Sequence, residues 1–115
     1  MGLDMNAYSC AAGESEQEKG VELFYWRKHP DLHGWMERLY RSKGGTDEFN
    51  CVSVELTSDD LDALERDVNA SALPHTTGFF FGSSGPFREE EDLRFIALAR
   101  EQIEQGRSVH YTSWW

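Results

Sequence analysis

Three consecutive phenylalanines, Phe79, Phe80 and Phe81, constrain the fold more than any other feature of the chain. Successive side chains of a β-strand point to opposite faces of the sheet, so this run needs apolar cover on both faces. Gly78 and Gly82 flank the run and mark its ends. The run therefore predicts an interior strand in the middle of a sheet.

Apolar residues at helical spacing predict a first helix that starts after His29 and ends before Gly44. Pro30 suits its first turn, and glycine commonly follows the end of a helix. Its apolar face consists of residues at positions i, i+3, i+4, i+7 and i+8, which are Leu32, Trp35, Met36, Leu39 and Tyr40. The spacing predicts one clean buried face.

Two further helices follow the same logic. Thr57 or Ser58 caps the second one, which ends before Pro74 and buries Leu61, Leu64 and Val68. The third runs over about 87–105. It buries four apolar side chains, Leu93, Ile96, Ala97 and Ile103.

Strands are predicted over 3–8 and 21–26, which we expect to pair, and over 49–56, 79–81 and 109–114. The order of elements is then β-β-α-β-α-β-α-β. This order predicts a single α+β domain over 1–115, in which about three helices pack on one mixed sheet of about five strands. Residues 11–20 contain no large apolar side chain from Gly13 onwards, and we expect a mobile surface loop there.

The 115-residue chain carries a formal net charge of −10, from 21 acidic and 11 basic residues. This charge repels phosphate backbones and anionic lipid surfaces, so we expect neither a nucleic acid nor a membrane as partner. A basic protein partner remains open. A homodimer is also compatible with the sequence, because it would cover the aromatic pair Trp114 and Trp115.

The opening residues contain neither a basic start nor an apolar run, so we expect no secretory signal. We also expect a cytoplasmic location, where Cys10 and Cys51 stay reduced. No apolar stretch approaches the roughly 20 residues that a membrane span needs.

Several segments together resemble a family of small uncharacterised proteins encoded by phages, prophages and their bacterial hosts. They are MGLDM at 1–5, YWRK at 25–28, a helix with His33 and Trp35, GFFFGS at 78–83 and YTSW at 111–114. The resemblance implies a phage or mobile-element accessory protein in a bacterial or infected host cell. It implies no activity.

The candidate ligand-binding residues form a polar set around the start of the first helix: Asp4, Trp26, Arg27, Lys28, His33 and Trp35. Basic side chains beside free helix amide groups can hold an anion, and a tryptophan can stack on a planar ligand. The simpler interpretation, which we favour, is that Asp4 pairs with Arg27 across two strands and that Trp35 belongs to the core.

Other chemistries have less support in the sequence. His29 and His33 could share a metal with Cys51 or His75, but no motif with metal-ligand spacing is present, and we expect no metal or cofactor. Residues 82–85 precede a helix like a phosphate loop, but the acidic run 89–92 opposes a phosphate there. Neither Cys51 with a histidine nor Ser83 with His75 forms a recognisable catalytic motif, and Cys51 is expected to be a small buried side chain of a strand.

Three functions remain. The first is a non-catalytic binding or regulatory protein with a small polar pocket for an anionic or planar ligand. The second is an acidic inhibitor that mimics DNA and occupies a basic host protein. The third is a small enzyme that acts on a nucleotide or another phosphorylated metabolite, but we assign no catalytic residue.

Overall fold

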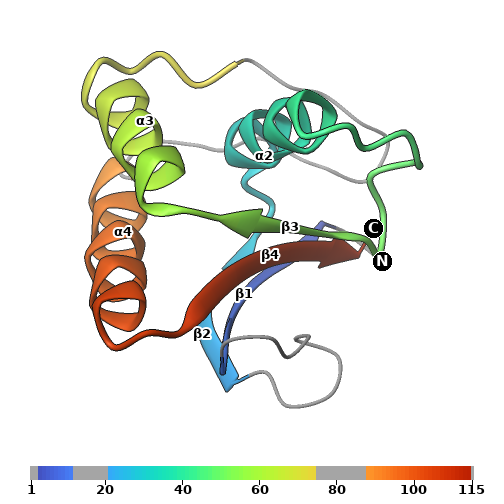
Figure 1. Ribbon diagram of the computed structural model, residues 1–115. Helices are drawn as coiled ribbons and strands as arrows, with labels where there is room; N and C mark the ends of the chain where they lie inside the picture. Colours follow the sequence, from blue (N-terminus) through green and yellow to red (C-terminus); the bar gives the residue numbers. More distant parts are fainter. Residues whose placement is uncertain (1–2, 12–20, 75–87, 115) are drawn as a thin grey trace.

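The computed structural model describes residues 3–11, 21–74 and 88–114 (Figure 1). The fold is α+β, as predicted, and its three helices correspond to the three predicted from apolar spacing. The elements in chain order are β1 Asp4–Cys10, β2 Val21–Arg27, α2 Pro30–Ser42, β3 Ser53–Leu56, α3 Ser58–Asn69, α4 Arg88–Glu104 and β4 Ser108–Trp114.

The described strands form one four-stranded sheet in the order β2-β1-β4-β3. All three pairs of neighbours are antiparallel, so the prediction of a mixed sheet is wrong for the described strands. The prediction followed from the alternating order of strands and helices, which does not determine the direction of each strand. In the structure two helices, α3 and α4, separate the neighbouring strands β3 and β4, which run in opposite directions.

The predicted count of about five strands and the predicted order of elements also differ from the structure. Over the described residues the order is β-β-α-β-α-α-β. The predicted strand at 79–81 lies outside the described residues, as do residues 12–20 of the predicted loop. The predicted strand 49–56 is shorter, because Cys51 has a positive φ of 62° and only Ser53–Leu56 is extended against β4.

The helices lie on one side of the sheet, and the core fills the space between them and the strands (Figure 1). Every second residue of each strand faces the helices, because side chains alternate between the two faces of a sheet. These residues are buried by the helices. They include Met5, Ala7, Trp26, Val54, Leu56, Val109 and Tyr111. Leu32 and Met36 of α2 and Phe95 of α4 close the core from the helix side.

Local sequence explains where the helices begin and end. Pro30 is the first residue of α2, and Gly44, with φ of 95°, follows the helix end, as the glycine signal predicted. At α3 the side chain of Thr57 accepts a hydrogen bond from the amide of Asp60. The Asp60 carboxylate accepts one from the amide of Thr57, which completes a capping box.

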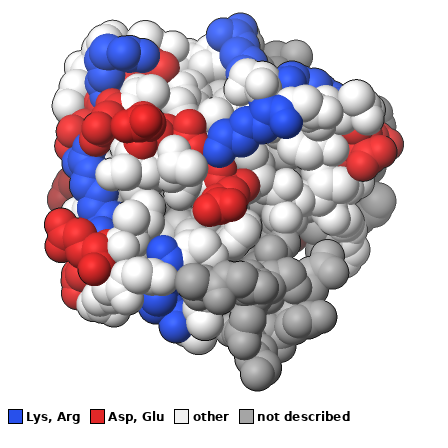
Figure 2. Space-filling model, viewed as in Figure 1, with Lys and Arg blue, Asp and Glu red and all other residues white. Residues whose placement is uncertain are grey.

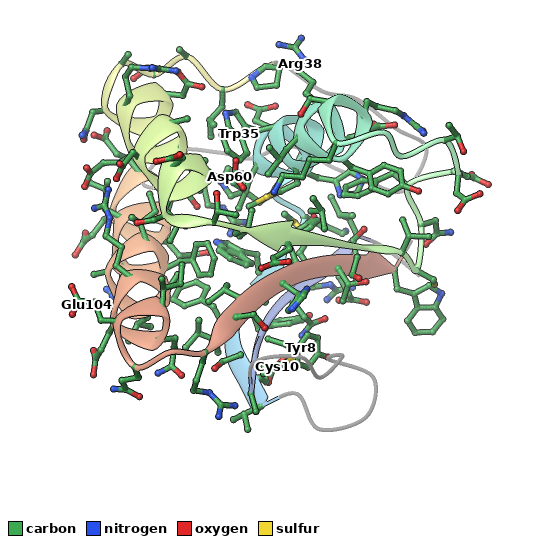
Figure 3. All side chains as sticks on the ribbon, viewed as in Figure 1. Tyr8, Cys10, Trp35, Arg38, Asp60 and Glu104 are labelled. Carbon is green, nitrogen blue, oxygen red and sulfur yellow. The ribbon has the colours of Figure 1, made fainter. Side chains whose placement is uncertain are left out.

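The opposite face of the sheet carries the alternate residues of the same strands, and no helix of the described residues packs on it (Figure 1). We call this face the open face. It consists of Asp4, Asn6, Tyr8, Glu22, Tyr25, Arg27, Ser53, Glu55, His110, Thr112 and Trp114. Figure 3 shows Tyr8 on the side of the sheet away from the helices.

Candidate functional site

Asp4, Tyr25 and Arg27 form a polar group, with one hydrogen bond and one ion pair, at one corner of the open face. The Tyr25 hydroxyl donates to Asp4 Oδ1 at 2.6 Å, and Arg27 Nε lies 3.8 Å from the same oxygen. The hydrogen bond to Asp4 raises the pKa of Tyr25, so this phenol remains a donor at neutral pH. The expected pairing of Asp4 with Arg27 across two strands is confirmed.

Trp114 flanks Asp4 on its other side. The register pairs Asp4 with Arg27 on β2 and with Trp114 on β4, so the three residues form one row across the sheet. Adjacent strands are about 4.8 Å apart, which makes this row about 10 Å long. Trp114 is 68% exposed and Tyr25 is 49% exposed, and these large rings are therefore available for contact.

Two further rows continue the open face beyond this corner. Asn6 Nδ2 donates to Glu22 Oε1 and holds that carboxylate over the sheet. Tyr8 is paired with Glu22 on one side and His110 on the other, and His110 is paired in turn with Glu55. The open face therefore carries neighbouring aromatic and carboxylate side chains and is not an apolar surface.

The structure separates Trp26 and His33 from the corner. Both are buried in the core, where Trp26 Nε1 donates to Asp92 Oδ1 at 3.2 Å and His33 Nδ1 lies 2.8 Å from the Tyr111 hydroxyl. Burial lowers the pKa of His33 to about 4, so its imidazole is neutral at pH 7. The alternation of strand side chains explains Trp26, which points to the face opposite that of Arg27.

Lys28 and Trp35 also lie apart. Lys28 is exposed just beyond β2 and has a positive φ of 54°. Trp35 is half-buried, and its Nε1 donates to Asp67 Oδ2 at 2.8 Å, toward α3 (Figure 3). Two residues along a helix correspond to a rotation of about 200°, so His33 and Trp35 cannot share one pocket from the same side of α2. The predicted six-residue pocket is therefore not assembled.

Sequence reasoning did not place Tyr25 and Trp114 beside Asp4. Tyr25 lies two residues before Arg27 and so points to the same face. The alternation of side chains along β1 puts Asp4, Asn6 and Tyr8 on one face, as observed, and the same rule along β2 adds Tyr25 to the face of Arg27. Trp114 could not be added without the pairing of β1 with β4, which no pattern in the sequence reveals.

A second polar group lies in the core beneath the start of α4. Asp92 is 1% exposed, and its Oδ2 is 2.9 Å from His29 Nε2. Arg88, one turn earlier on α4, donates to the backbone oxygen of Arg27 at 2.8 Å. These contacts tie α4 to the junction between β2 and α2, and the burial of the Asp92–His29 pair is typical of a structural role.

The sequence left a metal site and a reactive thiol only as weakly supported alternatives, and the residues concerned lie as follows. Over residues 3–11, 21–74 and 88–114, no three His, Cys, Asp or Glu side chains are grouped as a metal site. Cys51 is exposed rather than buried, because the positive φ places it outside β3, and that prediction is wrong. Cys10 is buried, and His75 and Ser83 lie outside the described residues.

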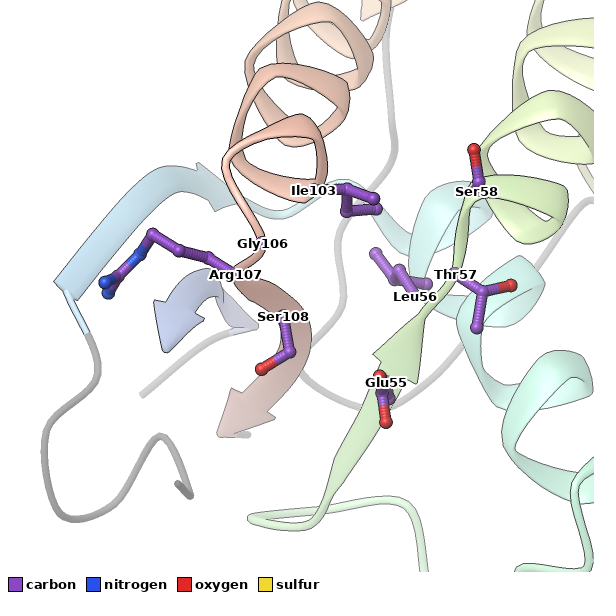
Figure 4. A pocket seen from close by; sticks show the side chains of 8 residues that line it. All are labelled: Glu55, Leu56, Thr57, Ser58, Ile103, Gly106, Arg107 and Ser108. Atoms are coloured by element: carbon purple, nitrogen blue, oxygen red, sulfur yellow. The ribbon is translucent and has the colours of Figure 1, made fainter. Parts of the chain in front are cut away.

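A surface hollow of about 360 Å³ lies between the start of α3 and the end of α4 (Figure 4). Leu56 and Ile103 form its apolar part, and Thr57 and Ser58 lie at its rim. Arg107 points away from these residues in Figure 4, and its Nε donates to Ser9 Oγ at 2.6 Å. Arg107 also lines the hollow, but its guanidinium is bound to Ser9 rather than directed at Leu56 and Ile103.

The acidic side chains are interspersed with basic ones. On α3 and α4, Arg100 donates to Asp62 at 2.7 Å and to Glu65 at 3.0 Å. Lys43 lies 2.6 Å from Asp60. Figure 2 shows acidic and basic side chains alternating over the surface formed by these helices, so no continuous acidic face is visible there.

Among the described residues, no helix is long and apolar enough to cross a bilayer. The chain matches no family model, no curated protein and no solved structure. The proposals below therefore depend on the geometry of the open face.

Proposed function

We propose that this chain is a non-catalytic binding protein that contacts its partner through the open face of its sheet. The observation that carries the proposal is the polar group in which Asp4 accepts a hydrogen bond from Tyr25 and forms an ion pair with Arg27, beside the exposed ring of Trp114. Exposed aromatic rings with oriented polar neighbours are typical of protein contact surfaces. Asp4 holds Tyr25 and Arg27 in place before any partner arrives, which lowers the entropic cost of binding.

The shape of the open face favours a macromolecule over the small ligand expected from the sequence. Small-molecule sites are concave and enclose most of their ligand. The corner residues instead lie on three adjacent strands of a sheet, and the carboxylate of Asp4 already neutralises Arg27. We therefore propose a polar contact patch in place of a polar pocket.

The segments that carry the resemblance to phage-encoded proteins support the same surface. MGLDM contributes Asp4, YWRK contributes Tyr25 and Arg27, and YTSW contributes Trp114, and the strand register joins all four residues at one corner. We propose an accessory protein of this type that acts in the cytoplasm of a bacterial or infected host cell. DNA mimicry is not proposed, because the acids are interspersed with basic side chains.

Site-specific photo-crosslinking in a bacterial host extract tests the contact surface. We expect Tyr25→benzoylphenylalanine and Tyr8→benzoylphenylalanine to give the same adduct, which unlabelled wild-type protein competes away. The matched positions Glu101 and Arg94 on α4 are exposed but lie on the other side of the molecule, and they should give no such adduct. Equal labelling from α4 and from the open face would contradict the proposal.

A further inference from the structure

The open face places each of its exposed carboxylates beside an aromatic ring. Along one row Glu22, Tyr8, His110 and Glu55 are successive cross-strand neighbours. Along another, Asp4 lies between Arg27 and Trp114. Neighbouring strands are about 4.8 Å apart, so one side chain of a partner can touch a ring and a carboxylate together.

Two of these carboxylates are held in place by neutral donors. Asn6 orients Glu22, and the Tyr25 hydroxyl orients Asp4. A carboxylate has about four acceptor positions on its two oxygens, so each still has acceptor positions that can face a partner. An exposed charged side chain that is already oriented loses little conformational entropy when it binds. More of its electrostatic attraction therefore contributes to the free energy of binding.

The chemistry of the face favours a cationic partner over an anionic or an apolar one. Three carboxylates, Asp4, Glu22 and Glu55, face a single guanidinium, Arg27, which Asp4 already neutralises. Guanidinium and ammonium groups bind both carboxylates and the faces of tyrosine and tryptophan rings. The exposed rings of Tyr25 and Trp114 supply such faces beside Asp4.

The net charge of the entire chain also favours a cationic partner. A net charge of −10 attracts a basic partner over long range and accelerates the encounter at low salt. It does not choose the contact point, because acidic side chains are also spread over α3 and α4. The aromatic rings determine where a basic partner binds. In the described surface the large exposed rings are Tyr25 and Trp114, and both belong to the open face.

We infer that the partner presents a segment rich in arginine or lysine, and that its cationic side chains lie between the rings and carboxylates of the open face. This inference rests on the proposed function and names the class of partner for the same surface. Each seated cation contacts a carboxylate at the side and a ring at its face. Salt weakens the carboxylate contacts more than the ring contacts.

The probe for the test is a synthetic octapeptide of alternating arginine and glycine, and its control contains citrulline, which has nearly the same shape without the charge. Calorimetric titration into the wild-type chain should show binding of the arginine peptide that weakens with added salt. The citrulline peptide should not bind. The intrinsic fluorescence of the tryptophans should change in parallel, because Trp114 is exposed at the contact.

Two charge-matched double variants separate recognition from general attraction. Glu22→Gln with Glu55→Gln removes two charges from the open face, and Glu101→Gln with Glu104→Gln removes two from the exposed surface of α4. We expect the first to raise the Kd by about tenfold and the second by less than about twofold. Trp114→Ala should also raise the Kd by about tenfold without altering the far-ultraviolet circular dichroism.

The outcomes separate this inference from the proposed function. An equal loss of affinity for the arginine peptide in the two double variants would show that the net charge alone attracts the peptide. That result would overturn the inference. Binding of the citrulline peptide as tight as that of the arginine peptide would do the same. A crosslinked partner at Tyr25 together with no binding of either peptide would overturn the inference while the proposed function stands. Absence of both adduct and peptide binding would overturn both.

Discussion

His33 is a neutral imidazole enclosed in the core, 1% exposed and 2.8 Å from the Tyr111 hydroxyl. Because burial lowers the pKa of His33 to about 4, the imidazole of the folded chain becomes protonated only near pH 4. The unfolded chain takes up this proton near pH 6.5. Between those two values only the unfolded state is protonated at this site, so a fall in pH favours unfolding.

The predicted effect of His33 on the free energy of unfolding is about 2 kcal/mol between pH 7.5 and pH 5, with lower stability at pH 5. His33→Asn keeps a polar group near Nδ1 but does not titrate, so it should remove about that much of the pH dependence, whatever its overall cost. Urea denaturation at the two pH values measures the difference. A pH dependence in His33→Asn as large as that of the wild type would contradict this prediction.

Asp92 is the most costly buried carboxylate to remove. Its two oxygens accept from Trp26 Nε1 and lie against His29 Nε2, at 3.2 and 2.9 Å. Asp92→Ala withdraws an acceptor from both groups in the core, and we expect a loss of about 3 kcal/mol or more. The midpoint of chemical denaturation measures this loss. Glu101→Ala, on the exposed surface of the same helix, should cost less than about 0.5 kcal/mol, and an equal cost would refute the role given to Asp92.

The sequence is sufficient to pair Asp4 with Arg27, and alternation along β2 separates Trp26 from Arg27, but the sequence is insufficient to place His33. Opposite charges on two strands that follow each other in sequence are a local relation, which alternation reveals. The partner of Trp26 is Asp92, 66 residues away, and that of His33 is Tyr111, 78 residues away. Such contacts depend on how the elements pack, which no local pattern states.

Helix α3 owes its first turn to the reciprocal bonds between Thr57 and Asp60. Partial burial alone would raise the pKa of Asp60, but hydrogen bonds from Lys43 and Thr57 lower it below its usual value, so the carboxylate stays ionised at the positive end of the helix. Thr57→Ala should reduce the free energy of unfolding by about 1 kcal/mol.

The matched control for this cap is Ser58→Ala. Both residues are exposed neighbours at the same helix start, but only Thr57 accepts from the amide of Asp60. Thermal denaturation should separate the two variants by several degrees, since 1 kcal/mol corresponds to about 3–8 °C in a chain of this size. A loss from Ser58→Ala as large as that from Thr57→Ala would show that the capping box is not the cause.

Among the elements, helices were easier to predict than strands. The apolar spacing and the proline at Pro30 located α2 within two residues of its observed end. The short strand β3 was overextended, because nothing in the sequence around Cys51 signals a positive φ. The prediction of strand directions was wrong for a different reason. These directions depend on how the connecting segments pack, which is a long-range property; over the described residues, α3 and α4 both lie between β3 and β4.

In the assembled molecule, stability should be greatest at the centre of the sheet. Strands β1 and β4 are each paired on both sides, while β2 and β3 form the edges of the described sheet. We expect amide hydrogen exchange, followed by mass spectrometry of peptides, to be slowest in Asp4–Cys10 and Ser108–Trp114. Exchange in Val21–Arg27 should be faster by about tenfold or more, and the reverse order would contradict the observed strand order.

The pairing of β1 with β4 also determines when the molecule can fold during its synthesis. Cys10 and Ser108 are neighbours in the sheet but are 98 residues apart in the chain. A ribosome that has not yet reached residue 108 holds a nascent polypeptide in which β1 has only β2 beside it, and an isolated hairpin is marginally stable in water. The central pair can therefore close only late in translation, and the apolar side chains of β1 must be protected from other nascent chains until then.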